Sequence, residues 1–224
     1  MSPSGYWITG TDTGVGKTML SAALIEVYKM HGKRVVGMKP VAAGCALREG
    51  VLRCDDSESL LRASSIKPER ALITPYAYAP PIAPHLAADA EQRPIEFAPI
   101  VAAYEALRKQ AEVVIVEGVG GFAVPLSAQH DTADLAVTIG LPVILVVGLR
   151  LGCLNHALLT QEAIIARGLD FAGWIANAID PDMDMRDENI AALDARLVAP
   201  RLGSVPFLEN PRSCTAAAFI DPPL

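Results

Sequence analysis

Two polar residues with the spacing for phosphate chemistry, Lys17 and Thr18, end a glycine-rich stretch at residues 10–18 (GTDTGVGKT). In such a stretch glycines let backbone N–H groups surround an anion, while lysine and hydroxyl groups reach phosphate oxygens and Mg²⁺. An apolar, strand-like run at residues 6–9 precedes the stretch, and a helical pattern follows it. The positive end of that helix would face the phosphate. The pattern predicts binding of a nucleoside triphosphate.

The stretch is one residue longer than the common phosphate loop, G-x-x-x-x-G-K-[ST]. Thr11 stands where that pattern has glycine, and Gly10 lies one residue further back. A plain glycine-rich connection between a strand and a helix is the alternative. The strand before the loop and the amphipathic helix after it favour the phosphate loop.

A carboxylate, Glu117, ends the apolar run at residues 113–116 and is followed by Gly118-Val119-Gly120-Gly121. An acidic side chain at the end of a buried strand can approach a Mg²⁺ ion held by Thr18. The glycines permit close approach of the backbone to an anion. In the alternative interpretation, Glu117 only caps a loop.

A second lysine, Lys39, lies in the segment GMKPVAAG at the end of a predicted strand, residues 34–38. Because ligands collect beyond the carboxyl ends of parallel strands, we expect Lys39 on the same edge of the sheet as Lys17. The alternative is an exposed, solvated lysine.

Three further polar residues have two interpretations each. Asp55 and Asp56 open a predicted helix, where they either cap it or reach the metal. Asn177 ends a predicted strand, where its amide either reads the edge of a base or forms a turn. The four histidines lack metal-ligand spacing, and the sequence has no nucleophile elbow or catalytic triad pattern. Histidine chemistry is therefore not expected.

The elements that must position these residues alternate along the chain. Val- and Ile-rich runs at residues 34–38, 113–116, 143–147 and 171–176 are typical of strands buried on both faces. Helical spacing occurs at residues 17–31, 56–64, 96–110, 132–139, 155–167 and 186–197. This alternation predicts an α/β fold of the P-loop NTPase type, with a doubly wound, mostly parallel sheet flanked by helices.

The segment at residues 74–99 differs from the rest because it contains six prolines. We expect them to prevent a regular helix or a central strand there, leaving a long ordered loop or a cap. Part of it could line the site, because long loops in compact domains are often functional. A passive surface excursion is the alternative.

Composition limits the classes of protein to which the chain can belong. With 224 residues, 51% of them hydrophobic, we expect one P-loop α/β domain spanning residues 1–224. A net charge of −6 argues against sequence-independent binding of nucleic acid. The four scattered cysteines are expected to be reduced, mostly structural thiols. Neither a signal peptide nor a membrane span is visible, so a cytoplasmic protein without a membrane partner is expected.

Taken in order, the motifs resemble the dethiobiotin synthetase family of biotin biosynthesis. The matching segments are residues 10–18, 39–42, 83–85, 116–121, 151–156, 173–177 and 203–206. The resemblance covers nearly the whole chain and is weakest after about residue 210.

The resemblance implies conversion of 7,8-diaminononanoate (7,8-diaminopelargonate) and CO₂ to dethiobiotin, with ATP and Mg²⁺ required. In that family one amine captures CO₂ as a carbamate, ATP phosphorylates the carbamate, and the second amine closes the ring. Such a reaction needs charge compensation more than a protein nucleophile. The absence of a triad pattern agrees with this.

The resemblance also implies roles for individual residues. Lys17, Lys39 and Thr13 would be catalytic, with Lys17 at the transferring phosphate and the other two at the carbamate. The nucleotide would be bound by Gly14, Val15, Gly16, Lys17, Thr18, Asn177 and Pro206. Thr18, Asp56 and Glu117 would surround Mg²⁺.

For the substrate, the resemblance implies contacts from Thr13, Lys39, Gly120, Gly121, Leu151, Gly152 and Asn155. The family forms homodimers with active sites at the interface, where residues 151–155 of the partner receive the substrate carboxylate at a helix N-terminus. A glycine followed by a helix start leaves N–H groups free for an anion, which supports this role.

Two residues depart from the family pattern. The family commonly has an acidic residue where this chain has Gly14, and a serine where it has Ala43. Backbone groups or water must replace the contacts of those side chains.

Two other functions compete with this one. A related P-loop amidoligase usually carries a glutaminase domain, for which the chain leaves no length. A partition-type ATPase switch has a signature lysine where this chain has Asp12, and no amphipathic membrane tail follows residue 210.

Overall fold

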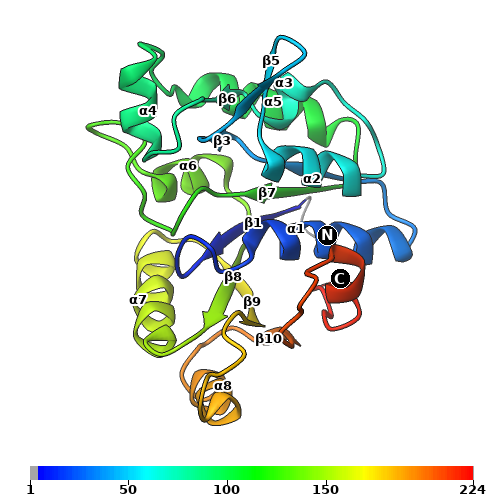
Figure 1. Ribbon diagram of the computed structural model, residues 1–224, viewed down its shortest axis with the longest axis vertical. Coiled ribbons are helices and arrows are strands. Elements are labelled where there is room, and N and C mark those ends of the chain that lie inside the picture. Colours follow the sequence, from blue (N-terminus) through cyan, green and yellow to red (C-terminus); the bar gives the residue numbers. More distant parts are fainter. Residues whose placement is uncertain (1–4, 224) are drawn as a thin grey trace.

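A six-stranded parallel sheet forms the centre of the molecule (Figure 1), as seen in a computed structural model that describes residues 5–223. The strand order is β10-β9-β8-β1-β7-β2, and every neighbouring pair is parallel. The strands are β1 (Gly5–Gly10), β2 (Val35–Met38), β7 (Val113–Glu117), β8 (Val143–Leu149), β9 (Phe171–Ala178) and β10 (Arg201–Val205). This order brings the carboxyl ends of β1, β2 and β7 together at one edge.

Helices cover both faces of the sheet, which makes the fold doubly wound (Figure 1). The helices that belong to the sheet layers are α1 (Lys17–Met30), α2 (Asp55–Ala63), α5 (Phe97–Arg108), α6 (Thr132–Ile139), α7 (Cys153–Ala166), α8 (Arg186–Asp194) and α9 (Ser213–Ala217). Side chains alternate between the faces of each strand. Ile8 of β1 therefore packs in one apolar cluster with α1 and α9, and Trp7 packs in another with α5 and α6.

Burial on both faces explains the composition of the central strands. All residues of β1, β2, β7 and β8 are buried. Apolar side chains are therefore favoured at every position and not at every second one. The predicted runs at residues 34–38, 113–116, 143–147 and 171–176 are confirmed as β2, β7, β8 and β9.

The six predicted helices are also confirmed, with ends shifted by a few residues. The predictions had no strand at β10 and no helix at α9. In β10 the glycine and serine of RLGSV weaken the apolar run. The helix α9 is fixed by packing on α1, and near the C-terminus the hydroxyls of Tyr6 and Tyr28 both donate to the Pro223 carbonyl, at 2.9 and 2.7 Å.

Smaller elements form a layer above the β2 edge of the sheet (Figure 1). They are β3 (Val41–Ala42), which pairs with β6 (Tyr76–Ala77), the antiparallel hairpin β4 (Ala46–Arg48) and β5 (Val51–Arg53), and the short helices α3 (Arg70–Ile73) and α4 (Pro84–Ala90).

The expectation that prolines exclude regular structure from residues 74–99 was wrong in part. The helix α4 begins at Pro84, and α5 has Pro99 in its first turn. Proline is tolerated there because the first N–H groups of a helix have no intrahelical acceptor, so none is lost. Among the described residues, no helix is both long and apolar enough to cross a membrane.

Candidate active site

A cavity of about 790 Å³ opens at the carboxyl ends of β1, β2 and β7. It gathers many of the residues singled out in the sequence. These are Thr13, Gly14, Gly16, Lys17, Thr18, Lys39, Asp56, Glu117, Gly120 and Gly121. Residues 81–84 of the proline-containing segment also line the cavity, so part of that segment faces the site.

The loop between β1 and α1 exposes backbone donors to the cavity. Gly14 and Gly16 have φ of 77° and 91°, a left-handed conformation that glycine adopts without strain. Gly16 caps α1 without a side-chain bond to the helix, so the first N–H groups of α1 have no helical acceptor. Together with the helix dipole, these N–H groups form an anion site.

Lys17 extends over this loop, and its Nζ donates to the Asp12 carbonyl at 2.7 Å. Burial and the nearby positive charge of Lys39 together lower the pKa of Lys17 to about 8, against the opposing effect of Glu117. An anion in the loop would stabilise the charged form.

Lys39 forms the centre of a buried ionic cluster. Its Nζ lies 2.5 Å from Glu117 Oε1 and 3.1 Å from Asp56 Oδ2, and it donates to the Gly118 carbonyl at 3.0 Å. Both Lys39 and Glu117 are buried. Although burial opposes its charge, the carboxylates of Glu117 and Asp56 raise the pKa of Lys39. In the same way Lys39 lowers the pKa of Asp56 against the effect of burial.

The oxygen atoms beside this cluster fit a magnesium ion. Thr18 Oγ1 donates to Glu117 Oε1 at 2.8 Å, and the buried Glu117 Oε2 has no hydrogen-bond partner. Mg²⁺ typically binds one or two carboxylates together with substrate phosphates. Within residues 5–223 no group of three His, Cys, Asp or Glu side chains forms a complete metal site, so phosphate oxygens would have to complete this one.

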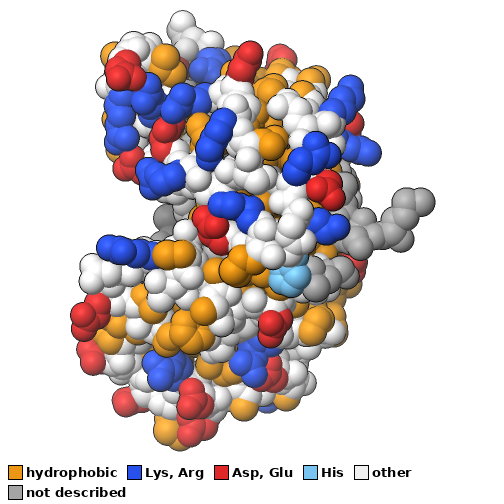
Figure 2. All heavy atoms as spheres, turned by 90° about the vertical axis from the view of Figure 1, so that its right-hand side faces the viewer, with side chains coloured by type: hydrophobic (Ala, Val, Ile, Leu, Met, Phe, Trp, Pro, Cys, Tyr) orange, Lys and Arg blue, Asp and Glu red, His pale blue; other side chains and the backbone are white. Residues whose placement is uncertain are grey.

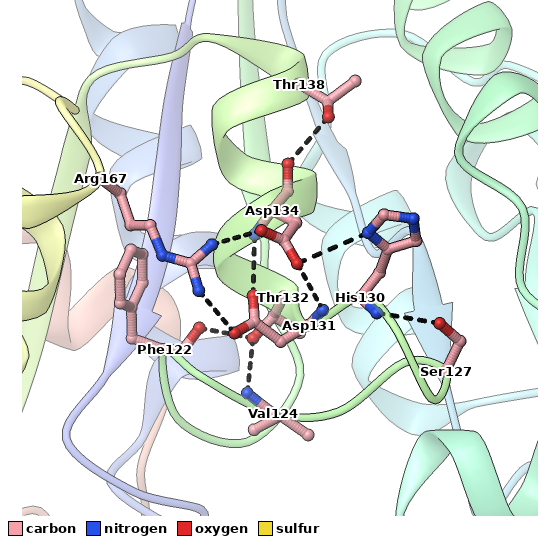
Figure 3. A network of polar contacts seen from close by, with 9 residues as sticks. All are labelled: Phe122, Val124, Ser127, His130, Asp131, Thr132, Asp134, Thr138 and Arg167. Atoms are coloured by element: carbon pink, nitrogen blue, oxygen red, sulfur yellow. Dashed lines mark hydrogen bonds and ion pairs between the residues drawn. The ribbon is translucent and has the colours of Figure 1, made fainter.

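The loop after β7 is held in place by the start of α6 (Figure 3). The Thr132 hydroxyl donates to the Phe122 carbonyl at 2.6 Å and accepts from Val124 N at 2.9 Å. These bonds fix the loop that carries Gly120, where φ is 65° and an added Cβ would lie 2.9 Å from Val124 Cγ2. The backbone at Gly120 faces Thr13, whose Oγ1 would lie 3.6 Å from that Cβ.

The start of α6 is itself fixed by a capping box and an arginine. Asp134 N donates to Asp131 Oδ1 at 2.8 Å, and Asp131 N donates to Asp134 Oδ2 at 2.9 Å. Arg167, at the end of α7, pairs with both carboxylates. The network joins the two helices that follow β7 and β8, the strands on either side of β1.

A second hollow of about 300 Å³ continues from the phosphate loop toward β10. It is lined by Gly14 and Gly16 on one side and by Asn177 and Pro206 on the other. Asn177 is buried, and its Nδ2 donates to the Val15 carbonyl at 2.8 Å. Asn177 therefore also fixes the phosphate loop, a role that the sequence did not predict because the two residues are far apart in the chain.

The predicted substrate residues at the start of α7 do not line the cavity of this chain. Leu151 is 96% exposed, and Gly152, with φ of 96°, caps α7 without a side-chain bond. Arg150 beside them pairs with Asp12 of the phosphate loop. The pairing of Arg150 with Asp12 was not predicted, because 138 residues separate the two and the local sequence around each gives no sign of it.

Comparison with known proteins gives one result for the family and one for the fold. The family model described as AAA domain matches residues 4–212. The ATP-dependent dethiobiotin synthetase BioD of Aromatoleum aromaticum is 52% identical, covering 97% of each chain. The protein of the same name from Nitrosospira multiformis is 49% identical, covering 97% of this chain and 94% of its own.

Solved structures of P-loop proteins share the fold at low sequence identity. The MinC:MinD cell division complex of Aquifex aeolicus matches with a TM-score of 0.57 at 16% identity, covering 91% of this chain and 81% of the other. MinD with Mg-ADP from Pyrococcus horikoshii matches with a TM-score of 0.55 at 16% identity, covering 96% and 87%. The predicted fold class is confirmed.

Proposed function

The chain belongs to the family of ATP-dependent dethiobiotin synthetases, and from this premise we propose how its cavity joins 7,8-diaminononanoate, CO₂ and ATP. The protein is an ATP-dependent ligase of biotin biosynthesis that forms carbon–nitrogen bonds. The assignment of individual steps to residues is the proposal.

The triphosphate of ATP occupies the loop between β1 and α1. The free N–H groups at Gly14, Val15 and Gly16 and at the start of α1 surround its phosphates, and Lys17 neutralises the transferring one. The lowered pKa of Lys17 supports this role, because a desolvated ammonium group next to another cation gains most from an arriving anion.

Thr18, Asp56 and Glu117 would hold Mg²⁺. When bound, the ion would neutralise charge on the phosphate oxygens. The unpartnered Glu117 Oε2 supports this assignment, as does the set of hard oxygen donors.

Lys39 and Thr13 bind the carbamate that forms when a substrate amine adds to CO₂. A carbamate oxygen attacks the terminal phosphorus of ATP and ADP leaves. The second amine then attacks the carbamate carbon, phosphate leaves, and the amine loses its proton. Lys39 compensates the negative charge on the carbamate oxygens, and the backbone at Gly120 and Gly121 orients the substrate.

The adenine of ATP binds in the hollow beside Asn177 and the backbone at Pro206. The substrate carboxylate binds at the N-terminus of α7, near Leu151, Gly152 and Asn155, of a second copy of the chain. The protein is thus a homodimer with active sites at the interface. The exposure of Leu151, together with the free helix N-terminus at Gly152, supports this arrangement.

The remaining parts of the proposal concern the whole chain. Residues 1–224 form one domain that works in the cytoplasm, without nucleic acid or membrane as a partner. The net charge of −6 supports the absence of a nucleic-acid partner. Acidic and basic side chains are mixed over the face in Figure 2.

One observation carries the proposal: Lys17 and Lys39 reach the same cavity, next to Glu117 and Asp56. The test is incubation of the purified protein with diaminononanoate, ATP, Mg²⁺ and bicarbonate labelled with heavy carbon and oxygen. We expect labelled dethiobiotin by mass spectrometry and one labelled oxygen in the released phosphate. Unlabelled phosphate alongside labelled product would contradict phosphorylation of the carbamate, and the absence of dethiobiotin would contradict the function.

A further inference from the structure

Two buried cysteines flank the β4–β5 hairpin above the active site. Cys45 directly precedes β4 and Cys54 directly follows β5. The hairpin pairs Arg48 with Val51 and Ala46 with Arg53, so the next opposite pair along the ladder is Cys45 and Cys54.

The hairpin geometry places this pair at a position suited to a disulfide. Glu49 and Gly50 form a two-residue turn with positive φ at both positions, and such a turn joins its flanking residues by a hydrogen bond. Hydrogen-bonded and non-hydrogen-bonded pairs alternate from there, so the cysteines occupy a non-hydrogen-bonded position, where Cα atoms are about 4.5 Å apart. Disulfides span Cα separations of about 4.4–6.8 Å. The Cys45 N–H correspondingly bonds outside the hairpin, to the Tyr78 carbonyl at 2.9 Å.

The two side chains lie on the same face of the hairpin, because the residues are opposite each other in the ladder. They share one small apolar cluster with Ala42. They also approach the neighbouring carbonyls of Ala42 and Ala43, each at 3.7 Å.

A small molecule can approach one of the two sulfurs. Cys54, but not Cys45, lines a cavity of about 360 Å³ behind the hairpin. The cavity is also lined by Arg53, Arg70 and Arg93. Arg53 pairs with Glu49, and Arg70 pairs with Glu58, which also lines the cavity. Arg93 lies over the rings of Tyr76 and Tyr78 and has no carboxylate partner within residues 5–223. The arginines of the lining favour binding of an anionic reagent.

We propose that Cys54 is the entry point for a small anionic disulfide such as glutathione disulfide, and that Cys45 completes an intramolecular Cys45–Cys54 disulfide. The neighbouring Cys45 thiol and burial raise the pKa of Cys54, so only a small fraction of Cys54 is thiolate and the attack is slow. This thiolate attacks one sulfur of the reagent, which leaves a mixed disulfide and releases one thiol. The Cys45 thiolate then attacks Cys54 Sγ and displaces the second thiol. The protein is oxidised by two electrons and loses two hydrogen atoms, and the reagent is reduced to two thiols.

The bond would alter the active site. Cys45 follows the segment that carries Lys39, and Cys54 directly precedes α2, which carries Asp56. A bond of about 2.05 Å between the two sulfurs would draw these two segments toward each other. Displacements on the order of 1 Å lower catalytic rates strongly. This consequence rests on the proposed function, and we expect turnover at least tenfold lower in the oxidised enzyme, restored by a reducing agent.

The chemical test uses full-length protein with Cys214→Ser, because Cys214 is exposed and would react by itself. Native protein is treated with glutathione disulfide and examined by intact mass and peptide mapping. We expect loss of two hydrogen atoms with a Cys45–Cys54 cross-link. Adding Cys45→Ser should trap one glutathione on Cys54, and adding Cys54→Ser should leave Cys45 unmodified. Cystamine, a cationic disulfide, should react more slowly at low salt.

Native protein that stays reduced would overturn the proposal, and so would a cross-link that involves Cys153. Neither outcome depends on whether the variants at Cys45 and Cys54 fold. Equal rates with the anionic and cationic reagents would overturn the role of the arginines. Unchanged turnover of fully cross-linked enzyme would overturn the effect on activity. A reduced protein that makes no dethiobiotin would instead contradict the proposed function, and the mass measurements would stand.

Discussion

The two active-site lysines differ in what their charges do for the fold. Lys39 is surrounded by Glu117, Asp56 and a carbonyl, and these raise its pKa despite burial. Lys17 has a carbonyl acceptor and a lowered pKa. Removing a buried cation that is paired leaves its carboxylate partner buried and uncompensated. Removing a cation whose charged form is already disfavoured by burial leaves no such charge behind. The two lysines therefore serve as matched controls for each other.

We expect Lys39→Ala to lower the free energy of unfolding by about 3–5 kcal/mol, because Glu117 is left buried without its counterion. Turnover should fall by several orders of magnitude, with nucleotide binding largely intact. Lys17→Met should leave the stability unchanged or higher while abolishing nucleotide binding. Urea unfolding and calorimetric titration with ATP measure the two effects.

Adding Glu117→Gln to Lys39→Ala should recover stability without recovering turnover. Wild-type turnover in Lys39→Ala would rule out its role at the carbamate. A destabilised Lys17→Met variant would contradict the difference between the lysines.

Asn177 connects base recognition to the phosphate loop through its bond to Val15. We expect the wild-type enzyme to prefer ATP over CTP in kcat/KM, and Asn177→Ala to reduce that preference and weaken nucleotide binding. Asn189→Ala, which removes an exposed amide bonded within α8, is the control and should change neither. Equal use of CTP and ATP by the wild-type enzyme would count against the role of Asn177.

At the scale of elements, helix ends set the shape of the substrate loop. The capping box of α6 and Arg167 of α7 hold Thr132, and Thr132 holds the backbone at Phe122 and Val124 (Figure 3). The first turn of α6 thus links loop position to the charge of two aspartates. Protonation of Asp134 should loosen the loop.

The bond from the Asp131 N–H, assisted by Arg167, holds the pKa of Asp134 below its ordinary value. A carboxyl whose pKa is lower in the folded state contributes stability above the unfolded-state pKa, and this is lost as the pH falls through the folded-state pKa. We expect Asp134→Asn to cost about 1 kcal/mol near pH 7, and the difference from wild type to shrink below about pH 4.

Urea unfolding at the two pH values measures this difference. Asp182→Asn, at an exposed turn position, should show no such change with pH. An Asp134→Asn difference that stays constant down to acid pH would contradict the charge dependence of the cap.

At the scale of the whole molecule, the described chain keeps two halves of the proposed site apart. Lys17, Lys39 and Glu117 line its cavity, whereas Leu151 points into solvent at the start of α7. If each active site includes α7 of a second copy, a substitution in the cavity and a substitution in α7 affect different sites of a mixed dimer. One site of that dimer can then be intact.

We expect Lys17→Met and Asn155→Asp to be inactive alone, the second because it repels the substrate carboxylate. Asn155 lies in the first turn of α7, where an aspartate is compatible with the helix dipole, so the fold should persist. Mixing the two variants and allowing subunits to exchange should restore part of the turnover. Light scattering should show a dimer. No recovery in a confirmed mixed dimer would contradict a shared site.

The sequence alone was sufficient to predict five of the six strands of the central sheet, its main helices, and a glycine-rich loop whose Lys17 and Thr18 line the cavity. Continuous apolar runs report burial on both faces, and the glycine-rich loop with Lys17 and Thr18 is a contiguous motif whose geometry follows from neighbouring residues. The edge shared by Lys39 and Glu117 could also be predicted, because both follow strands of a parallel sheet. Proline was misjudged at Pro84, where only its position in the first turn of a helix made it acceptable.

Other features depended on contacts between distant segments, which only the tertiary structure decided. The bond from Asn177 to Val15, the pairing of Arg150 with Asp12, and the contact of Arg167 with α6 join residues with no local signal. The four cysteines looked scattered, yet a two-residue turn places Cys45 opposite Cys54. Local sequence sets periodicity and loop chemistry over a few residues, whereas charge balance and burial depend on everything that packs around a group.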